Sequence, residues 1–400
     1  MTPWLHIVGL SENGITALPA VARNLIDNAE VLVGGDRHLA MVPEEHSADR
    51  HRWESPLRKT IARLKTVRGK RIVVLATGDP MSYGIGVTLT REFGIKAVAV
   101  LPAPGAFSLA SARMGWPLHD VDCLTLHGRP LELLILYLRP GGRLLILSEN
   151  GKTPAQVAAL LRDKGYGPSA MTVFDHMGGP TEALYENSAT EWGERRTADL
   201  NTIAVECIAG EGARFLSRMP GLPDDLFAND GQLTKREVRA ATLAALIPQP
   251  SALLWDVGAG SGSIAIEWMR AGGKAIAVEK DADRCATIAQ NAAALGTPTL
   301  EIVTGEAPGV LTGWSEPDAV FIGGGISADG LADTCWDALS AGGRLVANTV
   351  TLEGETALNA LQGRWGGSLT RIGVSHAEAV GRFRAWSPLR TVTQLVVAKP

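Results

Sequence analysis

Short apolar runs alternate with segments of helical spacing through the first 115 residues of the chain. The runs at 4–10, 30–35 and 71–80 each end in turn residues, which predicts strands. Residues 15–29 have the spacing of an amphipathic helix, and residues 97–115 predict a strand, a turn and a helix. This alternation indicates an α/β fold for the N-terminal part of the chain.

The pattern changes after Trp116-Pro117, which predicts a second lobe that begins near residue 115. Strands are more frequent than helices in this stretch. The predicted strands cover 123–126, 143–148, 170–175, 182–186 and 202–208, and the predicted helices lie near 130–138 and 153–164. We therefore predict one two-lobed domain over residues 1–209.

Residues 210–232 have neither the helical nor the strand periodicity of hydrophobic positions, and they form the clearest break in the chain. The segment has two prolines, several glycines and a run of acidic residues, which is typical of a domain linker. We predict a linker over 210–231 and a second domain over 232–400.

The second domain begins with a predicted helix at 234–246, in which Thr234 is the expected N-cap and Glu237 completes a capping box. A second α/β series follows. Its predicted strands cover 252–257, 274–279, 299–303, 318–322 and 343–348, with helices at 261–271, 282–294 and 330–339. Two last strands, within 368–378 and 390–400, are joined by a loop, which predicts an antiparallel pair.

The first strand of this series ends in a glycine-rich turn, LLWDVGAGSGSIAIEW, at residues 253–268. Gly258, Gly260 and Gly262 lie between a predicted strand and a predicted helix, as in nucleotide-binding crossovers. The third glycine comes one residue too early for the G-x-G-x-x-G fingerprint of dinucleotide sites. Glu279 ends the next strand and can accept hydrogen bonds from the ribose of a dinucleotide or of S-adenosylmethionine. The turn alone leaves both cofactors open.

Further features favour S-adenosylmethionine. Asp256 precedes the turn and is expected to meet the positive methionine end of that cofactor, whereas it would repel a pyrophosphate. Gly305, Glu306 and Ala307 follow the third strand and are expected to border an adenine. The fourth strand, 318–325, is acidic at its start and glycine-rich at its end, and the antiparallel end pair fits a methyltransferase sheet.

Composition limits the classes of function. The chain has 400 residues, a length that fits two or three domains. Its formal net charge is −4, and 46% of its residues are hydrophobic. The charge balance argues against a nucleic-acid-binding protein. The four cysteines have neither metal-ligand nor redox spacing, so we expect no metal site and a reducing compartment. The N-terminus lacks a signal-peptide pattern and no stretch reaches the length of a membrane span, so we expect a cytoplasmic protein without a membrane partner.

Residues 232–400 resemble the class I, Rossmann-type methyltransferases. Within that class they resemble the decarboxylating precorrin methyltransferases of cobalamin biosynthesis. The resemblance rests on LTKREVRAATLAAL before the glycine turn, and on TGEAPGVL and DAVFIGGG after it. It implies a Rossmann-like fold that binds S-adenosylmethionine.

Residues 1–209 resemble the tetrapyrrole methylase family, whose two-lobed α/β fold binds S-adenosylmethionine between the lobes. The resemblance rests on LHIVGLSENG, VVLATGDPMSYGIG and VLPAPGAFSLASARMGWPLHD. It implies a set of cofactor contacts in the first domain, at Gly78, Asp79, Pro80, Met81, Tyr83 and Ala106. The loop after Gly9 departs from the G-x-G-x-G of the family, which leaves the substrate contacts of that loop open.

In this order, the two halves resemble the fused, bifunctional precorrin C-5,15-methyltransferases. The resemblance implies that the first domain methylates precorrin-6B at meso carbon 5. It implies that the second domain methylates meso carbon 15 and removes carbon dioxide from the ring C acetate. We expect one S-adenosylmethionine per domain, no metal, and a homo-oligomer whose partner is a small tetrapyrrole rather than a nucleic acid.

Such a substrate carries many carboxylates, so we expect arginine and lysine side chains to anchor it. Thr234, Lys235 and Arg239 at the start of the 234–246 helix are candidate substrate contacts, and Arg236 is a further cation there. Lys235 and Arg239 are four residues apart and are expected to share a helix face. Arg129 is the candidate contact in the first domain.

Two residues are candidate catalytic groups, Lys235 and His127. A histidine carries protons near neutral pH, which is the reason for choosing His127. His176 and His376 have no supporting neighbours in the sequence, and we assign them no role.

Two other functions stay open at this point. One is a class I methyltransferase of another small molecule, with a non-catalytic N-terminal half. The other is a tetrapyrrole carrier that uses both folds only for binding. Asp256 and Glu279 argue against the carrier, because a carrier needs no cofactor contacts.

Overall fold

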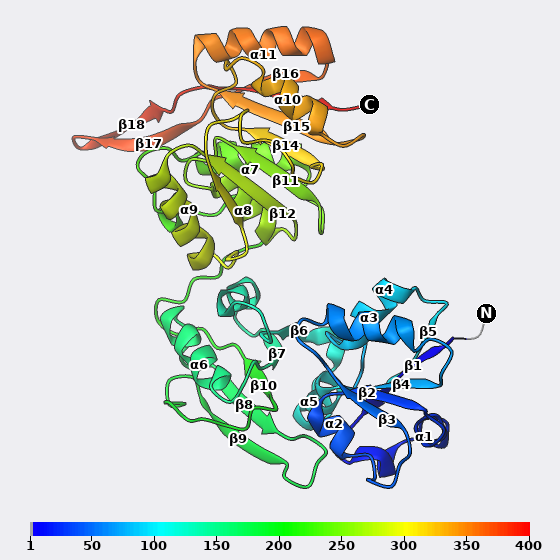
Figure 1. Cartoon of the computed structure of the whole chain (residues 1–400). Helices are drawn as coiled ribbons and strands as arrows, with labels where there is room; N and C mark the ends of the chain where they lie inside the picture. Colours follow the sequence, from blue (N-terminus) through cyan, green and yellow to red (C-terminus); the bar gives the residue numbers. More distant parts are fainter. Residues whose placement is uncertain (1–2) are drawn as a thin grey trace. The chain divides into compact units, whose positions relative to one another are not determined.

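The computed structural model describes residues 3–400, which form two compact units (Figure 1). One unit comprises the chain up to Leu131 together with Arg139–Arg214, and the other comprises Glu132–Leu138 and Phe215–Pro400. The second half of the expected linker thus belongs to the second unit. The reason is burial, since Leu222 and Phe227 are each 3% exposed and lie in the core of that unit.

The first lobe of the N-terminal unit is a parallel five-stranded sheet in the order β3-β2-β4-β1-β5. Its strands are β1 (Leu5–Leu10), β2 (Val31–Gly34), β3 (Asp49–Arg52), β4 (Ile72–Thr77) and β5 (Val98–Leu101). Its α-helices are α1 (Ala20–Asp27), α2 (Asp36–Ala40), α3 (Arg58–Thr66), α4 (Ile85–Phe93) and α5 (Ala106–Met114), and a 3₁₀ helix covers Gly14–Ala17. Side chains of β1 alternate between two clusters, with Val8 and Leu10 in one and Leu5 and Ile7 in the other.

The second lobe is a five-stranded sheet in the order β6-β7-β10-β8-β9, in which only β6 and β7 are parallel. Its elements are β6 (Asp122–Thr125), β7 (Arg143–Leu147), α6 (Thr153–Asp163), β8 (Ala170–Asp175), β9 (Ala183–Ser188) and β10 (Asn201–Glu206). A short 3₁₀ helix covers Leu118–Asp120. The helix expected near 130–138 is also a 3₁₀ helix, over Leu131–Tyr137, rather than an α-helix, and from Glu132 on it belongs to the C-terminal unit.

The C-terminal unit is built on a seven-stranded sheet in the order β13-β12-β11-β14-β15-β19-β16. Its strands are β11 (Leu253–Val257), β12 (Lys274–Glu279), β13 (Glu301–Thr304), β14 (Ala319–Ile322), β15 (Arg344–Thr349), β16 (Ser368–Ile372) and β19 (Val392–Ala398). The first five are parallel, and β19 runs antiparallel between β15 and β16. The chain moves outward from β11 to β13 and then returns to β14, so the strand order reverses between β11 and β14.

Helices cover both faces of this sheet (Figure 1). They are α7 (Arg236–Leu246), α8 (Ser263–Arg270), α9 (Ala282–Ala294), α10 (Leu331–Ala338) and α11 (Leu352–Trp365), with a 3₁₀ helix at Asp224–Leu226. Alternate residues of β11 point to opposite faces, since Leu254 packs in the cluster with α7, α8 and α9, and Trp255 packs in the cluster with α10 and α11. The predicted α/β architecture of both halves is confirmed.

The structure also contains elements that the sequence pattern did not predict. They are α2, β3, α3, α4 and α11, together with a hairpin of β17 (Ser375–Val380) and β18 (Phe383–Pro388). The strand expected over 368–378 is therefore split, since β16 ends at Ile372 and β17 begins at Ser375. The hairpin is exposed along its length, and Phe383 and Trp386 are 66% and 74% exposed. The predicted antiparallel end pair is present as β16 and β19.

Candidate functional site

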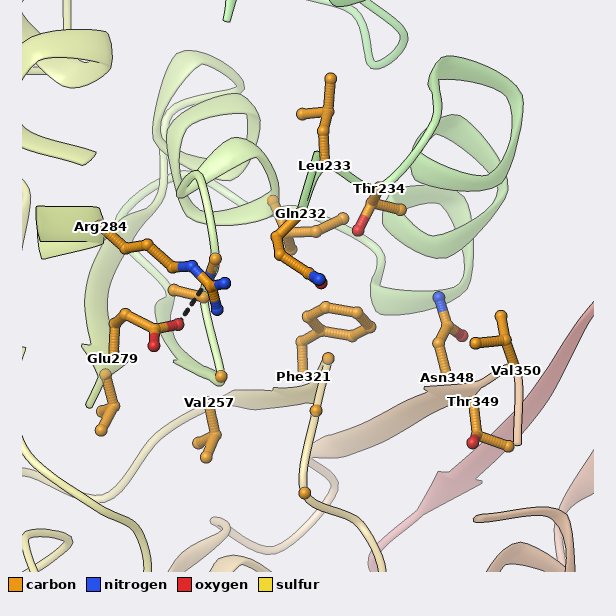
Figure 2. Close-up of a pocket in the computed structure, with 18 of the residues that line it drawn as sticks. Gln232, Leu233, Thr234, Val257, Glu279, Arg284, Phe321, Asn348, Thr349 and Val350 are labelled. Carbon is orange, nitrogen blue, oxygen red and sulfur yellow. Dashed lines mark hydrogen bonds between the residues drawn. The ribbon is translucent and has the colours of Figure 1, made fainter. Parts of the chain in front are cut away.

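A cavity of about 770 Å³ opens at the carboxyl ends of the parallel strands of the C-terminal unit (Figure 2). Its walls come from the ends of β11, β12, β14 and β15, from the start of β19, and from residues 230–235 before α7. The reversal of strand order between β11 and β14 leaves a crevice at this edge, where open α/β sheets bind ligands. Figure 2 shows Glu279 and Arg284 on one side of Phe321, and Asn348, Thr349 and Val350 on the other.

The predicted glycine turn forms part of the cavity wall. Gly258 and Gly260 both line it with positive φ, 72° and 59°. A side chain at Gly258 would begin 2.9 Å from the Gly324 nitrogen, and one at Gly260 would begin 2.9 Å from the Gln232 oxygen. Only glycine fits where backbone segments approach so closely. Gly262 does not line the cavity, and its space is taken by Ile288 of α9, 2.7 Å from the position of a Cβ.

Glu279 lies at the end of β12 and faces the cavity. Its carboxylate accepts hydrogen bonds from the Gly260 nitrogen at 2.9 Å and from the nitrogens of Lys280 and Asp281. These donors fix the orientation of the carboxylate, and the residue as a whole is 5% exposed. The structure also brings the predicted Gly305, Glu306 and Ala307 to the cavity wall, after β13. The nearby Arg284 is paired with Asp230, at 2.8 Å.

Asp256 occupies a different place from the one expected. It is 1% exposed, does not line the cavity, and accepts a hydrogen bond from the Ala265 nitrogen in α8 at 3.0 Å. Burial raises the pKa of its carboxyl to about 7, against the effect of that hydrogen bond and with a smaller rise from Glu279. Because it lies under the turn, its contact is with the first turn of α8 rather than with the cavity.

Thr234 and Lys235 both line the cavity, as expected of substrate contacts. The predicted capping box is wrong, because α7 begins at Arg236 and Lys235 is its N-cap, with extended backbone and no side-chain capping bond. The Thr234 carbonyl instead accepts a hydrogen bond from Arg239 at 2.5 Å. Lys235 is exposed and forms no ion pair with any described residue.

The structure contradicts the expectation that Arg239 contacts substrate. Its side chain is fully buried and pairs with Glu267 at 2.6 Å and with Asp224 at 3.0 Å. It also donates to the Leu222 carbonyl, and Glu267 accepts from the Leu222 nitrogen at 3.0 Å. A buried guanidinium needs such partners for its five donors, so Arg239 holds residues 222–234 onto the unit. Lys235 and Arg239 therefore do not share an exposed face.

The remaining cation of this helix start, Arg236, has a structural contact as well. It is exposed, and its Nε donates to the Gly221 carbonyl at 2.9 Å. Sequence reasoning missed Asn348, Thr349 and Arg390, which also line the cavity. Figure 2 shows the first two on the opposite side of Phe321 from Glu279. The rule that ligands bind at carboxyl ends of parallel strands applies to the first two, since they end β15. Arg390 precedes an antiparallel strand, and no pattern in the sequence marks it.

In the N-terminal unit, the predicted residues at the Gly-Asp-Pro turn lie together at the carboxyl end of β4. The Gly78 nitrogen donates to the Leu10 carbonyl at 2.8 Å, and a Cβ on Gly78 would lie 2.9 Å from the Gly105 Cα, which precedes Ala106. Asp79 accepts from the Met81 nitrogen at 2.8 Å, and Pro80 is buried in this turn. The turn thus approaches the start of α5 with no room for a larger residue at Gly78.

Tyr83 and Arg129 also come together. Tyr83 has a positive φ of 56°, and its hydroxyl donates to the Cys123 carbonyl of the second lobe at 3.1 Å. The Arg129 guanidinium lies 5.3 Å from the centre of the Tyr83 ring. His127 is exposed, with its Nδ1 3.3 Å from the Glu149 carboxylate. These residues share one region of the unit.

The expectation that His176 lacks a partner is wrong. Its Nδ1 lies 3.0 Å from Glu12, in the loop that departs from the family pattern, and Glu12 also pairs with Arg37. Arg37 in turn donates to the Thr77 hydroxyl at 2.8 Å, directly before the Gly-Asp-Pro turn. His38 next to it has its pKa lowered to about 4, by burial and by Arg37. His376 has a weaker partner, Glu237 at 3.8 Å.

Metal-ligand clusters and membrane-spanning helices are both absent from residues 3–400. In that range, no three His, Cys, Asp or Glu side chains are placed to hold a metal ion. No helix in the same range has the length and apolar character needed to cross a membrane. Cys207, Cys285 and Cys335 are buried, and burial raises the pKa of the Cys335 thiol to about 12.

Two family models match the chain. Residues 5–192 match the tetrapyrrole (corrin/porphyrin) methylases, and residues 225–399 match the precorrin methyltransferase domain. The two matches lie in the two units of the structure.

Curated relatives include one of full length. The precorrin-6Y C(5,15)-methyltransferase (decarboxylating) of Sinorhizobium sp is 44% identical over 396 residues, which covers 98% of this chain and 96% of the relative. The cobalt-precorrin-7 C(5)-methyltransferase of Salmonella typhimurium is 29% identical over 181 residues, 45% of this chain and 89% of the relative. A protein of Saccharolobus solfataricus named "Probable cobalt-precorrin-6B C(15)-methyltransferase (decarboxylating)" is 29% identical over 189 residues, 45% of this chain and 85% of the relative.

Proposed function

Because the chain belongs to the family of precorrin-6Y C(5,15)-methyltransferases (decarboxylating), we propose that it is a bifunctional enzyme of cobalamin biosynthesis. It transfers methyl groups from S-adenosylmethionine to meso carbons 5 and 15 of precorrin-6B and removes carbon dioxide from the ring C acetate. The observation that carries this proposal is the cavity at the strand reversal of the C-terminal unit.

We assign carbon 5 to the N-terminal unit, and carbon 15 with the decarboxylation to the C-terminal unit. Two relatives with a single methylation in their names support this division. Each matches 45% of this chain and most of its own length, so each activity corresponds to about half of a fused chain.

The C-terminal cavity has the features that S-adenosylmethionine needs. Gly258 and Gly260 form a cradle that a Cβ would fill, and Glu279 is a fixed acceptor beside it for ribose hydroxyls. Gly305 and Ala307 line the same cavity, and the Gly305 nitrogen donates to the Glu279 carbonyl at 3.0 Å, which supports an adenine beside them. Bound there, the cofactor supplies an electrophilic methyl group. We further propose that a second molecule binds at the turn of Gly78 to Tyr83 and beside Ala106 in the N-terminal unit.

The protein then acts mainly by positioning. A meso carbon of a reduced tetrapyrrole is nucleophilic, so holding it in line with the methyl group is the main requirement. Lys235 and Arg390 are exposed cations on the cavity wall without ion-pair partners among residues 3–400, and they are suited to the peripheral carboxylates. Arg129 beside Tyr83 has the corresponding place in the N-terminal unit.

Two further expectations concern the oligomeric state of the protein and its location in the cell. The exposed Phe383 and Trp386 of the β17–β18 hairpin support the proposal that the chain forms a homo-oligomer, which light scattering after gel filtration measures. The sequence composition supports a cytoplasmic location without a nucleic-acid or membrane partner, and fractionation of producing cells tests this location.

The decisive experiment is incubation with precorrin-6B and labelled S-adenosylmethionine, followed by mass spectrometry of the macrocycle. We expect a gain of two methyl groups and the loss of one carbon dioxide. A single methyl transfer would support a non-catalytic N-terminal half, and binding without any mass change would support a carrier.

A matched pair of variants separates the two sites. Gly260→Val and Gly78→Val each introduce a Cβ within 2.9 Å of backbone at positive φ. We expect titration calorimetry to show two S-adenosylmethionine per wild-type chain and one per variant. Gly260→Val should lose carbon 15 methylation and decarboxylation, and Gly78→Val should lose carbon 5 methylation. Loss of both activities in either variant, with the fold intact by circular dichroism, would contradict independent sites.

A further inference from the structure

One polar group on the cavity wall is held in a single orientation by a buried network. Asn348 of β15 lines the cavity, is 9% exposed, and lies opposite Gln394 in the register of β15 with β19. Its Nδ2 donates to the Thr242 hydroxyl of α7 at 2.8 Å, and its Oδ1 accepts from the Gln394 Nε2 at 2.9 Å. Gln394 also donates to the Thr242 hydroxyl at 3.1 Å.

The network fixes which end of the amide is which. The Thr242 hydroxyl donates to the Val238 carbonyl at 2.8 Å, so its proton is used and it can only accept from Asn348. Asn348 must therefore present an N–H to Thr242 and its oxygen to Gln394. An asparagine amide has two N–H donors and an oxygen with two lone pairs. One donor and one lone pair remain after these bonds.

The neutral character of this group matters because of what surrounds it. The cations of the cavity wall are Lys235, Lys280, Arg284 and Arg390. Lys280 and Arg284 have carboxylate partners, and Lys235 and Arg390 are exposed. No cation belongs to the segment 348–350 at the end of β15 (Figure 2). Asn348 is therefore a neutral donor on a cavity wall whose cations come from other segments of the chain.

A neutral donor is suited to the carboxylate that is lost in a decarboxylation. The bond from the carboxylate carbon to the side-chain carbon breaks, carbon dioxide leaves, and the electron pair passes into the conjugated macrocycle. A proton from water then adds to the side-chain carbon, so an acetate becomes a methyl group. The negative charge leaves the carboxylate in the transition state. A cation paired with that carboxylate would stabilise the ground state more than the transition state and slow the step.

We propose that the free N–H of Asn348 binds the acetate carboxylate that is lost as carbon dioxide, and that Gln394 is a positioning residue for it. This assignment rests on the proposed function. A neutral donor orients the carboxylate without the ground-state stabilisation of an ion pair. The exposed cations are left to bind the carboxylates that stay in the product.

The test is carbon dioxide release from precorrin-6B by the full-length protein. In Asn348→Leu we expect the rate at saturating substrate to fall on the order of 10- to 100-fold, as for the loss of one hydrogen bond to a charged group. The dissociation constant of S-adenosylmethionine should stay within about twofold, because Glu279 and the glycine turn are unchanged. Gln394→Met should lower kcat in the same direction without changing cofactor affinity.

Thr297→Val is the matched control. Thr297 is 1% exposed and its hydroxyl bonds to the Ala292 carbonyl, away from the cavity, so its loss reports on a buried polar deletion alone. We expect wild-type carbon dioxide release in this variant. If Asn348→Leu does not fold, Asn348→Ser gives the same test, since its shorter side chain cannot reach into the cavity.

The outcomes separate the two proposals. Carbon dioxide release within about twofold of wild type in a folded Asn348→Leu or Asn348→Ser protein overturns the role of Asn348. Equal loss of cofactor affinity and activity also overturns it, because the residue would then serve only the fold. A wild-type protein that neither methylates nor decarboxylates overturns the proposed function, and this inference with it.

Discussion

At the residue scale, two charged side chains near the glycine turn differ in a way that sequence does not show. Asp256 is the penultimate residue of β11, and Glu279 is the last residue of the neighbouring parallel strand β12. Strand alternation and the turn between β11 and α8 place Glu279 on the cavity and Asp256 beneath α8. The glycine turn singled out by its spacing lines a cavity, but which carboxylate faces that cavity depends on the path of the backbone.

The pKa of Asp256 leads to a prediction about pH and stability. In the unfolded chain its carboxyl loses its proton near 3.8, whereas in the folded chain burial delays this to about 7. The folded state thus holds more protons between about pH 4 and 7, so this group makes the free energy of unfolding fall as pH rises through that range. In Asp256→Asn, urea unfolding should show a weaker fall between pH 5 and 8, and higher stability than wild type at pH 8.

The control for this prediction is Asp283→Asn, at an exposed position in the first turn of α9. Its unfolding should follow the wild-type pH profile. An unchanged profile in Asp256→Asn as well would mean that Asp256 is already ionised in the folded protein.

At the element scale, α7 shows how a correct helix prediction can miss what the helix does. The pattern predicted a helix over 234–246, and α7 covers Arg236–Leu246. Lys235 and Arg239 were expected to share a face that contacts substrate, but Arg239 is buried because Asp224 and Glu267 come to it from other elements. Partners separated by 15 and 28 residues leave no periodic signal in the sequence. The sequence pattern also missed the β17–β18 hairpin. Its strands have no buried face, so they lack the alternation of apolar and polar residues that predicts a strand.

Arg239 gives a stability prediction for this helix. Arg239→Met should lower the free energy of unfolding of the C-terminal unit by about 3–5 kcal/mol, because it leaves Glu267 buried without its cation. Arg236→Met, on the same helix but exposed, should cost less than about 1 kcal/mol. Denaturant unfolding of both variants measures the difference. Equal effects would mean that the buried pair contributes no more than the surface bond.

At the scale of the whole molecule, the two-domain organisation was visible in the sequence but the boundary was not. Proline, glycine and acidic residues made 210–231 read as a linker, yet Leu222 and Phe227 pack into the core of the second unit. A segment rich in proline, glycine and acidic residues is a flexible linker only if none of its side chains packs on an apolar surface. Here Leu222 and Phe227 pack into the core and hold the segment in place. The family blocks, by contrast, predicted the order of the two folds correctly.

The boundary can be tested with two fragments. A chain of residues 215–400 keeps Leu222 and Phe227, whereas a chain of residues 232–400 loses both. Each buried side chain contributes about 1.5–3 kcal/mol, so the longer fragment should be the more stable by several kcal/mol in urea unfolding. Similar stabilities of the two fragments would indicate that residues 215–231 are a linker, as the sequence analysis predicted.

The place of the last strand in the sheet has a consequence for when the protein becomes active during its synthesis. β19 lies between β15 and β16, and it carries Gln394, which orients Asn348. During translation, both neighbouring strands are made before the strand that joins them. The central sheet therefore stays open at its β15 edge until Val392–Ala398 have been made. A chain released too early lacks the orienting contact of the cavity and exposes sheet edges that favour aggregation, so incomplete products differ from the finished enzyme in both activity and solubility.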